Sequence, residues 1–399
     1  MTENKKELEL YIHIPFCKRK CSYCDFLSAP GTDEEMEQYV NALVKEIRLH
    51  KKMAKAYLVC SIFVGGGTPS ILSTSLFSKI MLAVYDTFYI LDDAEITIEC
   101  NPGTVDAAKI KRYKELGINR ISIGLQSTHD YELRAVGRIH TYEEFLDCYY
   151  GFRAMGFDNI NIDLMAALPN QGLDSYKESL ERVISLRPEH ISAYSLILEE
   201  GTPLLHQIET ERKKGIETLP SEEVERKMYE LTEQMLLKEG YHRYEISNYA
   251  KEGRECRHNV GYWRRVSYLG LGLGSSSLVE ESRFSKIRDL NAYIQKMDQE
   301  DAVLADICEN ITPLSVKEQM EEFMFLGMRM MSGVSKKAFK EAFGYSIEEV
   351  YGKPVLRLDI EELIEQDDDR IWLTKHGIDV SNSVLCEFLI DEETQILHK

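Results

Sequence analysis

Short runs of β-branched and aromatic residues alternate with longer amphipathic segments through the first half of the chain. This alternation predicts a parallel sheet whose strands are joined by helices. The predicted strands are 9–14, 61–65, 94–100, 120–125, 159–164 and 190–196. The predicted helices lie near 33–54, 73–87, 105–116, 142–155 and 174–186. Six such units in succession indicate an α/β fold, a partial (β/α)6 TIM-like barrel whose open side admits a large substrate.

The rest of the chain divides into two predicted parts. We assign the barrel to 1–240 and a connecting segment to 241–304, which contains R-H-N-V-G-Y-W and the glycine-spaced Y-L-G-L-G-L-G. These glycines indicate close backbone packing near the substrate mouth. Residues 305–399 are acidic and helical with one strand-like run at 369–374, which predicts a mostly helical, winged-helix-like C-terminal domain.

Charge and hydropathy exclude several classes of protein. With 48 basic and 67 acidic residues the net charge is −19, which argues against a general nucleic-acid binder. No apolar run approaches the ~20 residues of a transmembrane helix, and the first ten residues are charged where a signal peptide would be apolar. We therefore expect a cytoplasmic protein that meets membranes only through partners, with its scattered cysteines as free thiols.

Three of the nine cysteines, Cys17, Cys21 and Cys24, cluster in a loop directly after the first predicted strand. A structural zinc site would need a fourth ligand, commonly from a second C-x-x-C pair, and the sequence has none. A disulfide does not fit an odd number of thiols in a reducing compartment. An iron–sulfur cluster held by three thiolates, with one iron open to another ligand, remains.

The loop C-K-R-K-C-S-Y-C resembles the cluster loop of radical S-adenosylmethionine (SAM) enzymes. The resemblance implies a [4Fe–4S] cluster whose open iron is chelated by the methionine part of SAM. It also implies release of a 5′-deoxyadenosyl radical in a cavity closed to solvent, with the electron coming from a donor such as a flavodoxin or ferredoxin.

The same resemblance implies a SAM site at the ends of successive strands, where α/β barrels build their sites. V-G-G-G-T-P, with Gly65 to Pro69, matches the glycine-rich turn that receives the amino group of SAM. Glu99 matches the contact to the methionine part, and Arg138 the partner of the SAM carboxylate. The remaining matches are Gln126 and Asp163 to the ribose and Ala193 beside the adenine. The predicted SAM residues are Tyr11, Tyr23, Phe26, Gly66, Gly67, Thr68, Glu99, Gln126, Arg138 and Asp163.

Two stretches need separate interpretation. Where the family pattern has a tyrosine and two glycines after the fifth strand, this chain has Ala166, Ala167 and Asn170, which we expect to alter the wall near the adenosine. The basic run 18–20 lies inside the cluster loop. We consider three interpretations of this run: it counters the negative charge of the cluster, it contacts haem propionates, or it is a solvated loop without a specific role.

The similarity extends to the group built around oxygen-independent coproporphyrinogen III oxidase, and within it to the HemW-type haem chaperones. The oxidases carry an extra cysteine where this chain has Phe26, and the chaperones carry H-N-x-x-Y-W, which is present here from His258 to Trp263. A neutral imidazole flanked by aromatic rings suits a haem ligand, so His258 is a candidate, helped by Cys256. The alternative is a core histidine bonded to Asn259.

The leading hypothesis is therefore a haem chaperone that carries a [4Fe–4S] cluster and SAM and delivers haem to acceptor apoproteins. The competing hypothesis is oxidative decarboxylation of coproporphyrinogen III propionates by the 5′-deoxyadenosyl radical, for which the extra cysteine is missing. A third hypothesis is a radical SAM enzyme that acts on an unrelated small molecule. In that case the H-N-x-x-Y-W segment is purely structural.

Overall fold

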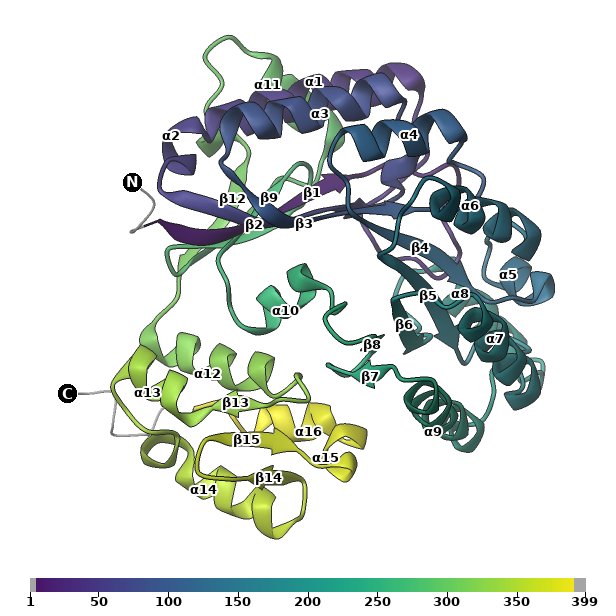
Figure 1. Cartoon of the computed structure of the whole chain (residues 1–399), viewed down its shortest axis with the longest axis vertical. Helices are drawn as coiled ribbons and strands as arrows, with labels where there is room; N and C mark the ends of the chain where they lie inside the picture. Colours follow the sequence, from purple (N-terminus) through teal and green to yellow (C-terminus); the bar gives the residue numbers. More distant parts are fainter. Residues whose placement is uncertain (1–4, 391–399) are drawn as a thin grey trace.

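The chain folds around one large, curved sheet. We describe residues 5–390 of a computed structural model. Six parallel strands lie side by side in chain order at the centre of the sheet (Figure 1). They are β1 (Lys6–Ile14), β2 (Tyr57–Gly66), β3 (Ile90–Cys100), β4 (Arg120–Gln126), β5 (Ile160–Ala166) and β6 (His190–Ser195). Each overlaps a strand predicted from the sequence, which confirms the α/β class and the repeated strand–helix unit.

Alternating side chains give each central strand two different faces. On β1 the even-numbered residues of 8–14 are fully buried in the core that the sheet shares with the outer helices. Glu9, Tyr11 and His13 alternate with them and line cavities on the inner face. The inner face is therefore partly polar, and this is where a site can be built.

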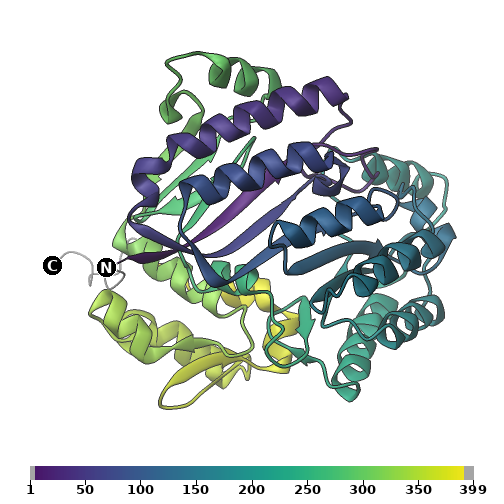
Figure 2. The same ribbon diagram turned by 45° about the horizontal axis from the view of Figure 1, so that its top comes forward.

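The helices that join the strands cover the outer face of the sheet (Figure 2). They are α1 (Asp33–Leu49), α3 (Thr74–Thr87), α4 (Ala107–Glu115), α6 (Tyr142–Ala154), α7 (Leu173–Ser185) and α9 (Glu222–Lys238). Capping boxes fix the starts of α1 and α6 at Thr32 and Thr141. The helical stretch predicted near 33–54 is confirmed, and it is divided at His50 into α1 and the short α2 (Lys51–Ala54).

Short elements went unpredicted. Two helices, α5 (Asp130–Ala135) and α8 (Pro203–Arg212), and the 3₁₀ turns Pro69–Ile71 and Leu304–Asp306 have no sustained apolar period to reveal them. The sheet also continues past both of its predicted edges. Beyond β6 lie β8 (Asn248–Ala250) and β7 (His242–Arg243), and beyond β1 lie β9 (Tyr268–Leu271), β10 (Ser276–Val279), β11 (Ser282–Lys286) and β12 (Cys308–Pro313).

The sheet therefore has twelve strands within the described residues, where we predicted six. β9 runs parallel to β1, whereas the pairs that β10, β11 and β12 form are antiparallel. The glycine-spaced stretch forms β9 and the turn after it, and a Cβ at Gly270 would lie 2.3 Å from the carbonyl of Ser276. The sheet thus runs through 241–304 and beyond it, and the domain boundaries drawn from the sequence stay a prediction.

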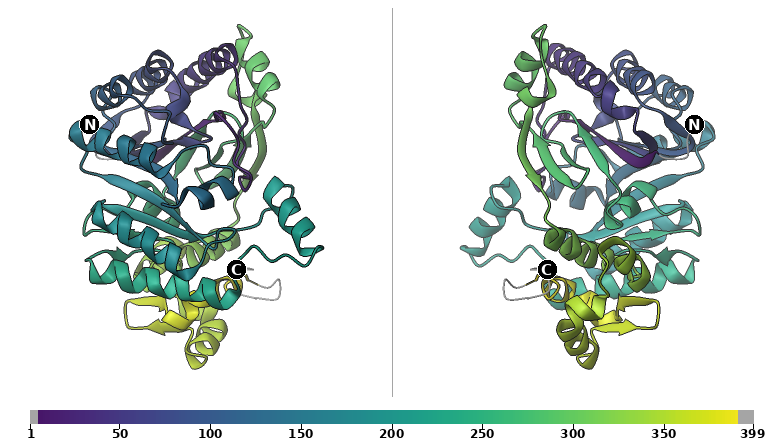
Figure 3. Two further views of the ribbon diagram at one scale, coloured as in Figure 1. Left: turned by 90° about the vertical axis from the view of Figure 1, so that its right-hand side faces the viewer. Right: turned by 90° about the vertical axis from the view of Figure 1, so that its left-hand side faces the viewer.

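The C-terminal part has a hydrophobic core of its own. Its helices are α12 (Val316–Gly327), α13 (Lys336–Phe343), α14 (Ile347–Ile360), α15 (Lys375–Asp379) and α16 (Ser381–Cys386). Its small sheet has the order β13 (Val334–Ser335), β15 (Arg370–Leu373), β14 (Ile364–Gln366). The mostly helical domain was predicted, and the predicted strand at 369–374 is β15. Figure 3 shows this domain below the large sheet from two sides.

One short helix lies between the large sheet and the C-terminal domain (Figure 1). It is α10 (Arg257–Trp263), which carries H-N-x-x-Y-W, and α11 (Leu290–Asp298) follows later and packs on α1. All nine cysteines lie in the described part of the chain and none forms a disulfide. Within residues 5–390, no helix combines the length and the hydropathy needed to cross a membrane.

Candidate functional site

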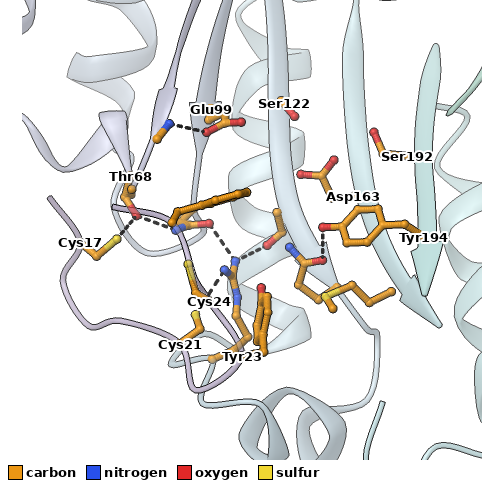
Figure 4. Close-up of a pocket in the computed structure, with 18 of the residues that line it drawn as sticks. Cys17, Cys21, Tyr23, Cys24, Thr68, Glu99, Ser122, Asp163, Ser192 and Tyr194 are labelled. Carbon is orange, nitrogen blue, oxygen red and sulfur yellow. Dashed lines mark hydrogen bonds between the residues drawn. The ribbon is translucent and has the colours of Figure 1, made fainter. Parts of the chain in front are cut away.

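The loop between β1 and α1 carries the three clustered cysteines. Its base is closed by the amide of Cys17, which donates to the carbonyl of Ala29, and by the amide of Ala29, which donates to Pro15. Cys17 is buried, while Cys21 and Cys24 are half-buried. Figure 4 shows all three on one loop beside the ends of the strands, and all three line a cavity of about 580 Å³.

The three cysteines are free thiols that line one cavity. Burial raises the pKa of Cys24, and the neighbouring Cys21 and Cys17 raise it further. Three thiolates held in this loop would repel one another unless a cationic group lay between them. The donor set therefore fits a multinuclear iron–sulfur cluster, whose irons separate the ligands.

The glycine turn after β2 packs directly on this loop. The amides of Gly67 and Thr68 donate to the carbonyls of Ile14 and Phe16 at 2.8 Å. A Cβ at Gly67 would lie 2.7 Å from the carbonyl oxygen of Phe16 and 2.9 Å from Cys17 Sγ. The Thr68 hydroxyl donates to Cys17 Sγ at 3.4 Å. Only glycine permits this approach, so the turn fixes the position of the first thiol.

Glu99, at the end of β3, is an acid inside the cavity. Its Oε2 accepts from the amide of Gly66 at 3.1 Å. Burial raises the pKa of Glu99 to about 8, and the nearby Asp163 adds to the effect. A cationic amino group arriving beside this carboxyl would restore its charge. Glu99 is thus suited to receive the ammonium group of an amino acid.

We expect Glu99→Gln to stabilise the ligand-free protein at pH 8 while weakening SAM binding at least tenfold. The unfolded chain releases the Glu99 proton near the ordinary value of 4.5, whereas the folded chain keeps it up to about 8. Stability contributed by this group is therefore lost as pH rises from about 4.5 to about 8. The gain should be on the order of 4 kcal/mol at pH 8 and near zero at pH 4.

Thermal unfolding of both proteins at pH 4 and pH 8 measures the gain, and calorimetric titration with SAM measures the binding. An equal difference between the proteins at the two pH values would contradict the assignment of a raised pKa.

Arg138 lines the cavity next to the thiol loop. Its Nη1 donates to Cys21 Sγ at 3.8 Å, and its Nη2 donates to Asn101 Oδ1 at 2.8 Å and to the carbonyl of Gly124. Its Nε is buried and has no partner within the described residues. A buried guanidinium with a free donor is a binding group for a carboxylate.

Gln126 and Asp163 complete the strand-end set. Gln126 has a positive φ of 73°, and its Oε1 accepts from the Tyr194 hydroxyl at 3.2 Å. Asp163 Oδ1 accepts from Asn161 Nδ2 at 2.7 Å, and burial raises the pKa of Asp163. Figure 4 shows Glu99, Asp163 and Tyr194 on separate strands around one space.

Most of the predicted residues meet in this cavity. Its lining includes Cys17, Cys21, Tyr23, Cys24, Phe26, Gly66, Gly67, Thr68, Glu99, Gln126, Arg138 and Asp163. Tyr11 lines the neighbouring cavity instead, where its hydroxyl contacts His13 Nδ1. Ala193 belongs to the hydrophobic core, and the adjacent Ser192 and Tyr194 line the cavity, because side chains alternate along β6. Asn101 also lines the cavity but was not predicted. Its position directly after β3, two residues beyond Glu99 in E-C-N-P, was a signal that it could do so.

The departures after β5 do not line the cavity. Ala166 and Ala167 are buried, whereas Met165 is the residue of this stretch that faces the cavity. Ala167 and Asn170 have φ of 60° and 63°, the left-handed conformation that glycine adopts without strain. The side chains of Ala166, Ala167 and Asn170 therefore do not form the cavity wall as we expected. The departure from the family pattern affects the backbone conformation at Ala167 and Asn170 instead.

We expect Ala167→Gly to stabilise the protein by about 0.5–1 kcal/mol, because it removes the strain of a left-handed alanine. Asn170→Gly should gain less, since asparagine tolerates this conformation. Ala166→Gly is the matched control, because Ala166 lies in β5 and has ordinary strand geometry. Urea unfolding compares the three. If Ala167→Gly loses as much stability as the control Ala166→Gly, the backbone at Ala167 is not strained.

A second cavity of about 850 Å³ adjoins the first. The two share Phe26, Phe63, Gly66, Glu99 and Asn259 as wall residues, with Asp25 at the mouth. The second cavity is bounded by the inner face of the sheet, by α10 and by α12 of the C-terminal domain. Its walls are rich in aromatic and cationic side chains, among them Tyr262, Trp263, Tyr268, Phe325, Arg265, Arg283 and Arg288.

His258 lies in the wall of this second cavity and is almost fully buried. Its Nδ1 contacts Ser61 Oγ at 2.8 Å, so the predicted partner Asn259 is replaced by Ser61. Burial, with the nearby Arg120 guanidinium, lowers the pKa of His258 to about 3, which keeps the imidazole neutral. Its Nε2 is buried without a partner in the described part of the chain. The rings of Phe63 and Tyr262 pack on it at 5.3 and 4.8 Å between centroids.

Helix α10 is held in the inner face of the sheet by two carboxylates. Glu95 of β3 accepts from the amides of Arg257 and His258 at 3.1 and 3.3 Å. Cys256 Sγ donates to the same carboxylate at 3.5 Å, so this thiol is engaged away from both cavities. The expected help of Cys256 in haem ligation gains no support from this position. Glu9 of β1 accepts from Ser61 Oγ at 3.0 Å.

The basic run 18–20 is exposed at the rim of the first cavity, where Lys20 Nζ donates to the carbonyl of Phe26 at 2.9 Å. Phe26 itself is 67% exposed at this rim.

Comparison with known proteins agrees with the site. A model of the radical SAM superfamily matches residues 11–183, and a model of the HemN C-terminal domain matches residues 314–380. "Heme chaperone HemW" of Lactococcus lactis is 34% identical over 388 residues, which cover 97% of this chain and 99% of that protein. The proteins of the same name from Bacillus subtilis and Escherichia coli are 36% and 32% identical, cover 95% and 96% of this chain, and are each covered to 98%.

Among solved structures, coproporphyrinogen III oxidase (HemN) from Escherichia coli, described as a radical SAM enzyme, superimposes with a TM-score of 0.84. The match covers 97% of this chain and 91% of that chain at 22% identity. At this identity the likeness shows a shared fold alone.

Proposed function

The chain belongs to the HemW family of radical SAM proteins, and from this premise we propose that it binds haem and delivers it to haem-requiring apoproteins. The observation that carries the proposal is the joined pair of cavities. One is lined by thiols, the other is walled by aromatic rings and arginines, and the two share a wall. Cavities of this size accommodate organic ligands. A flat macrocycle in the second cavity would lie next to the thiol loop.

Membership of the radical SAM superfamily implies a [4Fe–4S] cluster and SAM. We assign the cluster to Cys17, Cys21 and Cys24, and the amino and carboxylate groups of SAM to Glu99 and Arg138. When bound, this pair supplies one-electron cleavage of the sulfonium. The chain contributes position and charge: the Gly66–Gly67 turn fixes the loop, Arg138 faces both a thiol and the ligand space, and the buried walls exclude water.

The remaining assignments to SAM concern its nucleoside. Gln126 and Asp163 are proposed for the ribose, because both present oxygens into the first cavity from strand ends. Tyr23, Phe26 and Thr68 line the same cavity around the cluster loop. Tyr11 lies further from this space, on the wall of the second cavity, and is better placed to contact haem.

We propose His258 as the axial ligand of haem. Its Nδ1 is engaged by Ser61, which leaves Nε2 as the nitrogen with a free lone pair, and its low pKa keeps it neutral as a ligand must be. Because Nε2 is buried under packed rings, ligation requires Tyr262 or Phe63 to move. Both rings line the second cavity and would then contact the porphyrin.

The haem acceptor and the electron donor belong to the same proposal. The exposed cations 18–20 near the cluster loop suit an acidic donor of the flavodoxin or ferredoxin type. We place this activity in the cytoplasm, with membrane contact only through partner proteins.

Coproporphyrinogen III oxidation is the second candidate, and the shared fold is what favours it. Phe26 stands at the rim where the oxidases carry their extra cysteine. Anaerobic incubation with coproporphyrinogen III, SAM and a reductant tests it. We expect no protoporphyrinogen to form, and its formation would replace the chaperone proposal.

Haem titration of the anaerobically reconstituted protein and of His258→Ala tests the main proposal. We expect the haem Soret band of the variant to shift and the affinity for haem to fall at least tenfold, because the iron loses its axial nitrogen. His190→Ala is the matched control. His190 is equally buried, between Asn161 and Tyr244, but lies outside both cavities.

The control should keep the normal haem spectrum. An unchanged spectrum and affinity in His258→Ala would remove His258 as ligand, and no haem binding by the normal protein would overturn the proposed function.

A further inference from the structure

Two arginines and one glutamate meet at the edge of the second cavity, and we call them the carboxylate clamp: Arg265, Arg283 and Glu322. Arg265 follows α10, Arg283 lies on β11, and Glu322 lies on α12 of the C-terminal domain. Arg265 Nε donates to Glu322 Oε2 at 3.1 Å, and Arg283 Nη2 donates to Glu322 Oε1 at 2.6 Å. One carboxylate thus uses both oxygens to join two guanidinium groups from the large sheet to the C-terminal domain.

The clamp is largely shielded from water yet faces the cavity. The Arg265 and Glu322 side chains are 9% and 11% exposed, and that of Arg283 is 41% exposed. All three residues line the second cavity. An ion pair that involves the shielded Arg265 and Glu322 is less screened by water than one on the surface. The site is therefore suited to hold a carboxylate.

Neighbouring groups fix the two arginines. Arg265 Nη2 donates to Glu281 at 2.7 Å, and Arg283 Nη1 donates to the Tyr268 hydroxyl at 3.2 Å. Arg265 and Glu281 have positive φ values of 55° and 56°, a strained conformation for residues with a side chain. The arginines are thus held in place from the side of the sheet, whereas Glu322 comes from the other domain.

The cavity wall beside the clamp is aromatic. Tyr262, Trp263, Tyr268 and Phe325 line it, and the buried Nε1 of Trp263 lacks a partner in the described part of the chain. A ligand that satisfies both surfaces is flat and apolar with a carboxylate at its edge. The geometry matches the chemistry of a porphyrin with propionate side chains.

Resting on the proposed function, we infer that Arg265 and Arg283 bind a propionate of haem, and that Glu322 occupies the place of this propionate until the ligand displaces it. One carboxylate that bridges the two arginines replaces another, so each arginine keeps a carboxylate partner. Displacement breaks the two ion pairs that join α12 to Arg265 and Arg283.

The test compares haem with its iron protoporphyrin dimethyl ester, whose propionates carry no charge. The normal protein should bind haem at least tenfold more tightly than the ester. Arg283→Gln should lose most of this preference and bind the ester as the normal protein does. Glu322→Gln should bind haem several-fold more tightly, because the internal competitor is gone. Arg264→Gln is the matched control, since Arg264 is adjacent and exposed but lines a different cavity.

The outcomes separate this inference from the function on which it rests. Equal binding of haem and ester by the normal protein would overturn the clamp and leave the haem proposal standing. Binding of neither ligand would overturn the proposed function. Weaker haem binding by Glu322→Gln, with circular dichroism and melting temperature unchanged, would show that Glu322 supports the site and would overturn its role as competitor. If Glu322→Gln fails to fold, the half-exposed Arg283 variant alone decides the question.

Discussion

Replacing any one of Cys17, Cys21 and Cys24 by serine will abolish the iron–sulfur cluster. All three thiols line one cavity, on a loop closed by backbone hydrogen bonds. Within the described residues, Cys100 is the other cysteine that lines this cavity, but it lies at the end of β3 and packs in the hydrophobic core. Iron and acid-labile sulfide should fall from about four per chain to near zero, with loss of the brown absorption.

Cys60→Ser and Cys386→Ser are the controls for this experiment. Cys60 is buried on β2 away from the loop, and Cys386 is exposed on α16. Both variants should keep normal iron and sulfide. Near-normal cluster content in any of the three loop variants would refute the ligand assignment, because two thiolates from this loop do not hold a cluster in place of three.

Replacing Gly261 by alanine will displace α10 from the sheet. A Cβ at Gly261 would lie 2.0 Å from Glu9 Oε1 and 2.3 Å from Glu9 Cδ. Glu9 is itself buried and accepts a hydrogen bond from Ser61 Oγ at 3.0 Å, so a methyl group at position 261 would force this carboxyl out of its place and break that bond. We expect a loss of about 3 kcal/mol in the free energy of unfolding, together with loss of haem binding, since α10 carries His258.

Gly352→Ala is the matched control for this substitution. Gly352 also lies in a helix, α14, but its Cβ would meet no atom within 4 Å. Alanine there should stabilise the protein slightly, by about 0.5–1 kcal/mol. Chemical denaturation and haem titration of both variants measure the two effects. An unchanged stability in Gly261→Ala would mean that α10 is not packed on Glu9 as described.

The first cavity was predicted from the sequence because of a property of parallel strands. Glu99, Gln126 and Asp163 each end a predicted strand, and the carboxyl ends of parallel strands meet at one edge of a sheet. The resemblance to radical SAM enzymes selected these residues, and the order of the strands explains why they lie together. The three cysteines follow the first strand by only a few residues, so their loop had to reach the same edge.

Because successive side chains of a strand point to opposite faces of the sheet, the sequence did not predict correctly which single residues face the cavity. Ala193 was assigned to the cavity, although Ser192 and Tyr194 face it, because a motif gives the position on a strand with an error of one residue. One residue reverses the side of the sheet on which a side chain lies. The left-handed conformations of Ala167 and Asn170 could be interpreted only once their φ values were known.

The second cavity could not be derived from the sequence. Its walls come from β1, α10, β11 and α12, and no periodicity along the chain relates Phe63 to Arg283 or Glu322. The short strands β9 to β12 that bring these residues together carry few alternating apolar side chains. Ser61, the partner of His258, is likewise 197 positions away in the chain.

By itself the sequence determined the strand–helix repeat, the thiol loop and the family, because local patterns of hydropathy and spacing encode them directly. Tertiary structure alone decided which charged side chains meet at the second cavity and which nitrogen of His258 has no partner in the described residues. It also decided that the Cys256 thiol bonds to Glu95. Contacts of this kind depend on how distant segments pack, and packing is a property of the whole core that no short stretch of residues contains.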